Sequence, residues 1–206
     1  MPIFGGPWLC TTLQDGVITL NLTRSALDEC GAESYNQAER KMLEDVFVLS
    51  DLIIKNVEEF KNAYVASVAT TAGIRQCRRI KGMHVLTGEE YLSSYKHPSS
   101  IARSCHAIDI HLPNGEGQIL KFPQQAGYIP YDCMVNEKAD NLIVAGRAIS
   151  ADEEAFAATR VQAPCMEMGQ AAGIAVNLCL KNGNIPVWAV DRERLVERVK
   201  KTGSFV

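Results

Sequence analysis

The chain has 206 residues, of which 47% are hydrophobic and 22% are charged, and its formal net charge is −3. This composition is typical of a soluble globular protein with one large or two small domains. Nucleic-acid binding is not expected, because counterion release requires clustered lysine and arginine and the one basic cluster, Arg75 to Lys81, is short. The chain has neither a membrane-length apolar run nor a signal-peptide pattern at its start, so we expect a cytoplasmic protein without membrane contact.

The first third of the chain is predicted to contain a strand and a long helix. Residues 16–24, GVITLNLTR, alternate between polar and apolar side chains as a half-buried strand does. Ser34 and Gln37 have the spacing of a capping box, in which two side chains satisfy the first N–H groups of a helix. Apolar residues then recur every three or four positions, which predicts an amphipathic helix over about residues 35–62.

The middle of the chain combines short strand patterns with one capped helix. The patterns predict, in order, a strand over 63–69, a strand over 73–82, a helix over 88–95 behind a capping box of Thr87 and Glu90, and strands over 106–112 and 118–122. The last two strands flank the turn sequence PNGEG, so we expect them to form a hairpin.

A continuous apolar run, NLIVAG at residues 141–146, ends beside the cation of Arg147. An apolar run without alternation predicts a strand that is buried on both faces. Gly146 has no side chain, so a ligand can approach the main chain there. The alternative is that Gly146 forms a turn and has no further role.

A helix rich in small residues is predicted over 164–183. Pro164 suits its first turn, Lys181 its last turn, and Gly183 the left-handed position beyond it. One face of the helix is nearly free of bulk, at Gly169, Ala172, Gly173 and Val176. A short surface helix capped by Asp191 follows.

The start of the small-residue helix, near Val161 and Gln162, has unpaired N–H groups that suit an anion or an electron-rich carbonyl. Together with Gly146 and Arg147, it predicts a ligand site with close backbone approach. From the spacing alone, packing of a sheet against glycine and alanine is an equally good interpretation.

Four ordered segments carry a resemblance that is more specific than any single spacing: GIRQCRRIKG, YIPYDCMV, DNLIVAGR and RVQAPCMEMGQAAG. They resemble the motifs G-[IV]-R-x-x-R-R-I, I-P-Y-x-x-[LM]-V, D-N-L-[LI]-V-A-G-R and R-V-x-x-x-C-M-x-x-G-Q-A-A-G from the C-terminal half of the FAD-dependent oxidoreductase family. The resemblance implies FAD as cofactor and hydride transfer from a small organic substrate to FAD.

The resemblance also implies how the chain is organised. We expect an α+β fold, with a mixed-sheet substrate-side domain over residues 1–125 and the closing strand and helices of an FAD-binding domain over 126–206. The family's N-terminal half carries a Rossmann G-x-G-x-x-G motif, which this sequence lacks. The expectation is therefore a C-terminal fragment, a truncated gene product or half of a split enzyme, inactive alone. The alternative is a non-catalytic assembly module that pairs with a separate Rossmann subunit. We also expect the fragment to form a homodimer, because apolar surface shaped for the missing half would otherwise face water.

Individual site residues follow from the same resemblance. The implied cofactor-binding residues are Gly146, Arg147, Arg160, Val161 and Gln162. Two further residues are candidates for catalysis. Arg75 lies on a strand that runs beside the flavin in this family, where it either binds a substrate carboxylate or braces the fold. Glu153 replaces the histidine of the S-A-T-H-E-A sequence that is common in the family, which changes the usual acid or base at that position.

Other reactive side chains have simpler explanations. One alternative is a metal site at Cys105, His106, Asp109 and His111. In a strand, however, His106 points to the face opposite to the other three, and we expect no metal. Cys165, near a helix start, is either a thiol of lowered pKa or, as we favour, a packing residue.

Overall fold

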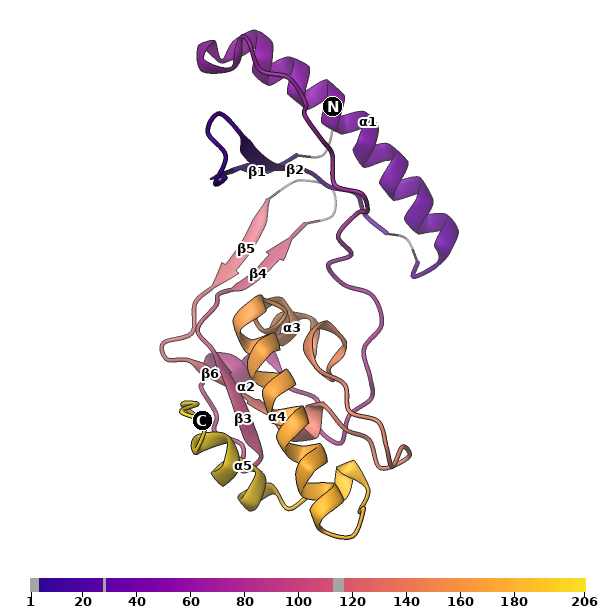
Figure 1. Ribbon diagram of the computed structural model, residues 1–206, viewed down its shortest axis with the longest axis vertical. Coiled ribbons are helices and arrows are strands. Elements are labelled where there is room, and N and C mark those ends of the chain that lie inside the picture. The colour runs from indigo at the N-terminus through magenta and orange to yellow at the C-terminus, as the bar shows by residue number, and fades with distance from the viewer. Residues whose placement is uncertain (1–3, 28, 113–116) are drawn as a thin grey trace. The chain divides into compact units, whose positions relative to one another are not determined.

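The computed structural model describes residues 4–27, 29–112 and 117–206 (Figure 1). The chain divides into two compact units, Met1–Ile74 with His111–Gly117, and Arg75–Ile110 with Gln118–Val206. Helices and small two-stranded sheets make up the structure, so the expected α+β class is confirmed. The domain boundary expected near residue 125 stays a prediction. No helix of the described residues is long and apolar enough to cross a membrane.

The sheet of the first unit is a strand pair. β1 (Phe4–Thr11) runs antiparallel to β2 (Ile18–Thr23), with Cys10 opposite Thr19. The strand predicted over residues 16–24 is thereby confirmed as β2. β1 escapes the sequence analysis because its first half contains two glycines and a proline, residues that are depleted in strands.

The long predicted helix is confirmed as α1 (Ala32–Asn56), followed by the 3-10 turn η1 (Glu58–Phe60). The predicted capping box is wrong, because Gly31 precedes the helix and no side chain caps it. Gln37 donates instead from Nε2 to Glu33 Oε1 at 2.9 Å. The buried residues of α1 are Ala38, Asp45 and Leu49. Large apolar side chains on its other faces are exposed, namely Leu43, Phe47, Val48 and Leu52.

Residues 63–69 and 73–82 form no strand, so both predictions are wrong. A strand belongs to a sheet when a second strand lies about 5 Å away and a row of backbone hydrogen bonds joins the two. The second segment makes an isolated bond, from Ile80 N–H to Ala148 O at 2.9 Å. The alternation of apolar and charged side chains in this segment therefore does not indicate a sheet.

Two more strand pairs are present: β3 (Ser100–Ser104) with β6 (Gly127–Pro130), and β4 (Ile108–His111) with β5 (Gln118–Lys121). β3 and β6 are antiparallel, with Ala102 opposite Ile129. The pairing predicted for 106–112 and 118–122 is confirmed as β4 with β5, and residues 113–116 of its turn lie outside the described residues.

The helical elements of the second unit are α2 (Gly88–Leu92), η2 (Tyr131–Cys133), η3 (Gly146–Ala148), α3 (Glu153–Thr159), α4 (Gln162–Lys181), η4 (Val187–Ala189) and α5 (Arg192–Lys200). The capping box before α2 is confirmed, since Glu90 N–H donates to Thr87 Oγ1 and Thr87 N–H to Glu90 Oε2. The left-handed Gly183 after α4 is confirmed by its φ of +84°. Asp191 caps α5 by accepting from Arg194 N–H at 3.1 Å.

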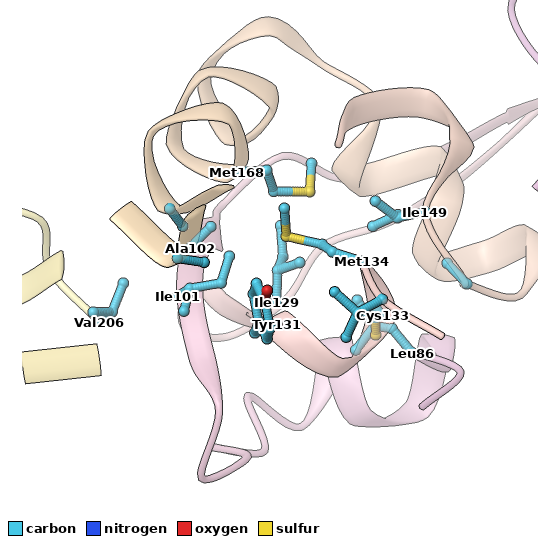
Figure 2. Packing of buried hydrophobic residues seen from close by; sticks show 14 of the residues in the cluster. Leu86, Ile101, Ala102, Ile129, Tyr131, Cys133, Met134, Ile149, Met168 and Val206 are labelled. Carbon is cyan, nitrogen blue, oxygen red and sulfur yellow. The ribbon is translucent and has the colours of Figure 1, made fainter. Parts of the chain in front are cut away.

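The core of the second unit lies where β3 packs against α4 (Figure 2). Its fully buried side chains include Ile101 and Ala102 of β3, Ile129 of β6, Tyr131 and Cys133 of η2, Met134, Ile149, and Met168 of α4. This packing holds the middle of α4 in place, whereas the first two residues of the helix, Gln162 and Ala163, are exposed.

Residues 141–145 form no strand, so the buried strand predicted there is wrong. Leu142 is 46% exposed, and Val144 N–H donates to Met134 O at 2.8 Å. The apolar run predicts burial, but in the described part of the chain no strand pairs with it. The run leads instead into η3, which carries Gly146 and Arg147.

Candidate functional site

The start of α4 is uncapped. Val161 precedes the helix in an extended conformation, and no side chain caps it. Gln162 and Ala163, the first two helical residues, are exposed. The N–H groups of a helix start point away from the helix and carry a partial positive charge. This end of α4 is therefore suited to an anion or a carbonyl oxygen.

Two arginines lie beside this helix start, and the charge of a third acts on one of them. Arg160 ends α3 and lies two residues ahead of α4, while Arg147 belongs to η3, which packs against α4. Burial lowers the pKa of Arg160, and the positive charges of Arg75 and Arg147 lower it further. Both cations must therefore lie within electrostatic reach of Arg160. The charge of Arg75 thus acts on Arg160 although 85 positions separate the two residues in the sequence.

Asp109 of β4 is the carboxylate that holds Arg160. Arg160 Nη2 lies 3.5 Å from Asp109 Oδ2 and donates to Asp109 O at 3.2 Å. The negative charge of Asp109 raises the pKa of Arg160 against the burial and the two arginines. Gln118 Nε2 in turn donates to Asp109 Oδ1 at 2.6 Å. The charge of Asp109 thus acts on Arg160 against the charges of Arg75 and Arg147.

Gly146 lies against the first turns of α4. Its φ is +75°, a conformation that favours glycine, and a Cβ there would lie 3.5 Å from Cys165 Sγ. Burial raises the pKa of the Cys165 thiol, although the charge of Arg147 opposes the rise. The Cys165 Sγ is 3.7 Å from Thr159 O. The packing role that we favoured for Cys165 is consistent with these contacts, and a lowered pKa is not.

The two candidate catalytic residues lie in different places. Arg75 is exposed and its charge reaches Arg160, as described above. Glu153 is the exposed first residue of α3, whereas Arg160 follows the last. Arg160 lies seven positions after Glu153, which is roughly 10 Å along the helix axis at about 1.5 Å a residue. Of the expected site residues, Glu153 is therefore the one set apart from the start of α4.

Two residues of this region were missed by the sequence analysis. Asp109 has a role because it pairs with Arg160, 51 positions away, and no local pattern predicts that. Arg79 donates from Nη1 to Asp152 O at 2.8 Å and its Cζ lies 5.3 Å from the centre of the Phe156 ring. Arg79 thus braces the start and body of α3. The capping role of Asp152 could have been predicted from the sequence, because an aspartate followed by EEA is a common helix start.

Two other features lie outside this group. Among residues 4–27, 29–112 and 117–206, no group of three His, Cys, Asp or Glu side chains is placed to hold a metal ion. A surface hollow of about 720 Å³ lies beside α2 and β5, where Lys121 forms an ion pair with Glu154. None of the expected site residues lines that hollow.

Comparisons with known proteins give one match. A family model described as FAD dependent oxidoreductase matches residues 6–201. Searches of curated proteins and of solved structures found no match.

Proposed function

Because the chain belongs to the FAD dependent oxidoreductase family, we propose that η3 and the start of α4 hold the flavin end of its FAD. The observation that carries this proposal is the uncapped start of α4, with Arg160 two positions ahead of it and Arg147 in η3, which packs against α4. The family gives the chain FAD as cofactor and a place among flavin oxidoreductases.

The residues present fit such a cofactor. FAD carries a negatively charged pyrophosphate and polar ring carbonyls, and both suit cations and helix N–H groups. Gly146 leaves its backbone without a side chain beside Cys165. The proposed cofactor-binding residues are Gly146, Arg147, Arg160, Val161 and Gln162.

The chain's own groups have separable tasks in this proposal. The N–H groups of Gln162 and Ala163 hold negative charge at the helix start, where they are oriented before a ligand arrives. Arg147 contributes a fixed cation, and Asp109 keeps Arg160 oriented. When bound, FAD supplies the acceptor for a hydride from a small organic substrate.

The substrate side rests on fewer observations. Arg75 is proposed to bind a substrate carboxylate, because it is exposed and part of the cation group. Glu153 is proposed as the acid or base in place of the family's histidine, although it lies at the far end of α3. The cytoplasmic location stays a proposal from the sequence. So do the hypothesis of a C-terminal fragment and its alternative, an assembly module that pairs with a separate Rossmann subunit.

Amide NMR of the full chain with added FAD tests the proposal. The Gln162 and Ala163 amide signals should shift, with weak affinity, because the adenine end of FAD has no partner in the motifs of this chain. Arg147→Ala should weaken the binding by about 1.5 to 3 kcal/mol, the range for a hydrogen bond to a charged group.

Arg194→Ala is the matched control. Arg194 donates to Asn182 just past the other end of α4, roughly 30 Å from Gln162 along a 20-residue helix. This variant should bind FAD as the natural chain does. Shifts that spare Gln162 and Ala163 at saturating FAD, or equal weakening in both variants, would contradict the assignment.

A further inference from the structure

The hydroxyl of Tyr91 is buried beside the connection between β3 and β4. Tyr91 belongs to α2 and has no exposed surface. Its hydroxyl oxygen lies 2.9 Å from Ser104 O and 2.6 Å from His106 O. Burial raises the pKa of Tyr91, so the hydroxyl keeps its proton and shares it between the two carbonyls. One phenol thus ties both sides of the turn that leaves β3 to α2.

The ring of Tyr91 is held in place by β6. A Cβ added at Gly127 would lie 2.4 Å from Tyr91 Cδ2 and 2.6 Å from Tyr91 Cε2. Carbon atoms in contact normally stand about 3.5 to 4 Å apart, so the ring fills the space that a side chain would need. Packing therefore fixes where the hydroxyl points. A phenylalanine at this position fills the same space without the hydroxyl.

Ser104, the last residue of β3, joins this turn to α3. Its hydroxyl donates to Ala158 O at 3.0 Å, two positions before Arg160. A carbonyl in the last turn of a helix has no partner within that helix, and Ser104 supplies one here. Ser104 Oγ also accepts from His106 N–H at 3.3 Å. The turn at residues 104–106 therefore holds the main chain just before Arg160.

The same turn leads into β4. His106 stands three positions before Asp109, whose main-chain oxygen accepts from Arg160 Nη2 at 3.2 Å. Arg160 is thus held at two points, its main chain through Ser104 and its guanidinium through Asp109. Both points depend on the path of the chain at residues 104–106.

We propose that Tyr91 is a positioning residue for Arg160, and that its hydroxyl keeps this cation in place at the start of α4 through the turn at residues 104–106. The role toward FAD rests on the proposed function, in which Arg160 binds the cofactor. Without the hydroxyl, the carbonyls of Ser104 and His106 lose a donor inside the protein, which is unfavourable. The turn then shifts to find other partners, and Arg160 loses its fixed direction.

Tyr91→Phe tests the proposal, and Tyr131→Phe is the matched control. Tyr131 is also fully buried, and its hydroxyl donates to a main-chain oxygen, Val187 O, at 2.9 Å. Val187 begins η4, which follows the far end of α4. Both variants remove one phenol hydroxyl from the second unit, so both should unfold at lower urea concentration than the natural chain. A loss of stability is therefore common to both, and positioning needs a separate readout.

The Arg160 Nε–Hε signal in NMR of the FAD-free chain supplies that readout. It should shift or broaden in Tyr91→Phe and stay unchanged in Tyr131→Phe. Ser104→Ala removes the bond to Ala158 O and should move the same signal, which keeps the test open if Tyr91→Phe does not fold. An Arg160 signal that ignores Tyr91→Phe and Ser104→Ala, or that changes equally in Tyr131→Phe, overturns the proposal.

Titration with FAD, followed at the Gln162 and Ala163 amides, measures the consequence for the site. Tyr91→Phe should raise the dissociation constant by about 2- to 10-fold, the change that one hydrogen bond supports, whereas Tyr131→Phe should leave it unchanged. Equal constants in the natural chain and Tyr91→Phe overturn the role toward FAD. A natural chain that does not bind FAD contradicts the proposed function, and the Arg160 signal then still decides whether Tyr91 positions this cation.

Discussion

Arg160 lies with Nη2 3.5 Å from Asp109 Oδ2, and the two side chains are 12% and 18% exposed. A strand, β4, therefore fixes the residue that ends α3 and precedes α4 by two positions. Because two other arginines lower the pKa of Arg160, this carboxylate offsets more than one positive charge. The contact makes the cation at the helix start part of the fold as well as part of the candidate site.

Asp109→Asn should therefore destabilise the second unit. The substitution leaves the mostly buried Arg160 beside Arg75 and Arg147 without its counter-charge. We expect the free energy of unfolding to fall by about 1 to 3 kcal/mol in a urea titration, the range for leaving a charged hydrogen-bonding group unpaired. Asp51→Asn breaks an exposed ion pair on α1 and should change it by less than about 0.5 kcal/mol. Equal changes in the two variants would show that Asp109 contributes little.

Gly146→Ala should be destabilising for a backbone reason. At a φ of +75°, an alanine costs about 1 to 2 kcal/mol, and its Cβ would also lie 3.5 Å from Cys165 Sγ. Gly169→Ala is the matched comparison, because it lies inside α4 and no atom lies within 4 Å of the added Cβ. That variant should gain about 0.5 to 1 kcal/mol, the difference between alanine and glycine in a helix. Chemical unfolding of both variants measures whether each substitution lowers or raises the free energy of unfolding. An unchanged free energy of unfolding in Gly146→Ala would argue against a fixed conformation at this turn.

The thiols should differ widely in reactivity. Burial raises the pKa of Cys133 to about 12, so almost no thiolate is present near neutral pH. Cys105 is an exposed free thiol. Alkylation with iodoacetamide at about pH 8, followed by mass spectrometry, should therefore modify Cys105 first and Cys133 only after denaturation. Rapid modification of Cys133 in the native protein would mean that the core around η2 opens often.

The helices of this chain were largely predictable from local patterns. α1 and α4 show long runs of periodic apolar residues, and the capping box of Thr87 and Glu90 is a contact between neighbours. The strands over 63–69, 73–82 and 141–145 were wrong for the opposite reason. Their patterns describe side chains, whereas a strand also needs a second strand beside it, and none pairs with them among the described residues.

The candidate site was predictable only in part. Gly146, Arg147 and Val161 lie in motifs, and the uncapped start of α4 follows from the sequence around Pro164. The contact of Asp109 with Arg160 joins distant segments, and only the fold reveals it. Glu153 shows the limit of a motif, because a substitution within it does not tell where the side chain lies.

The homodimer expected from the sequence stays a prediction, and one face of α4 is suited to it. One stripe of this helix is apolar and exposed, with Met166 at 74%, Val176 at 42% and Leu180 at 62% exposure. Between them, Gly169 and Gly173 have open space where a side chain would stand. The stripe carries no charge. Met166 and Gly169 lie seven and four positions before Gly173, and Val176 and Leu180 lie three and seven positions after it. The spacing of the stripe is therefore nearly the same when it is followed in either direction.

Two copies of such a stripe are complementary when a two-fold axis through Gly173, perpendicular to the helix, packs the two helices antiparallel. Met166 then meets Leu180 of the second copy, while Val176 fills the space above Gly169. Antiparallel packing also aligns the helix dipoles favourably. Leu180→Glu should weaken dimerisation by at least about 100-fold, since the two-fold interface loses two leucines and burying each contributes about 1.5 to 3 kcal/mol. Analytical ultracentrifugation over a dilution series measures this, with Leu120→Glu on β5, 49% exposed, as the control. A natural chain that stays monomeric at every concentration, or a control that dissociates as readily, would show that this face of α4 does not bind a second copy.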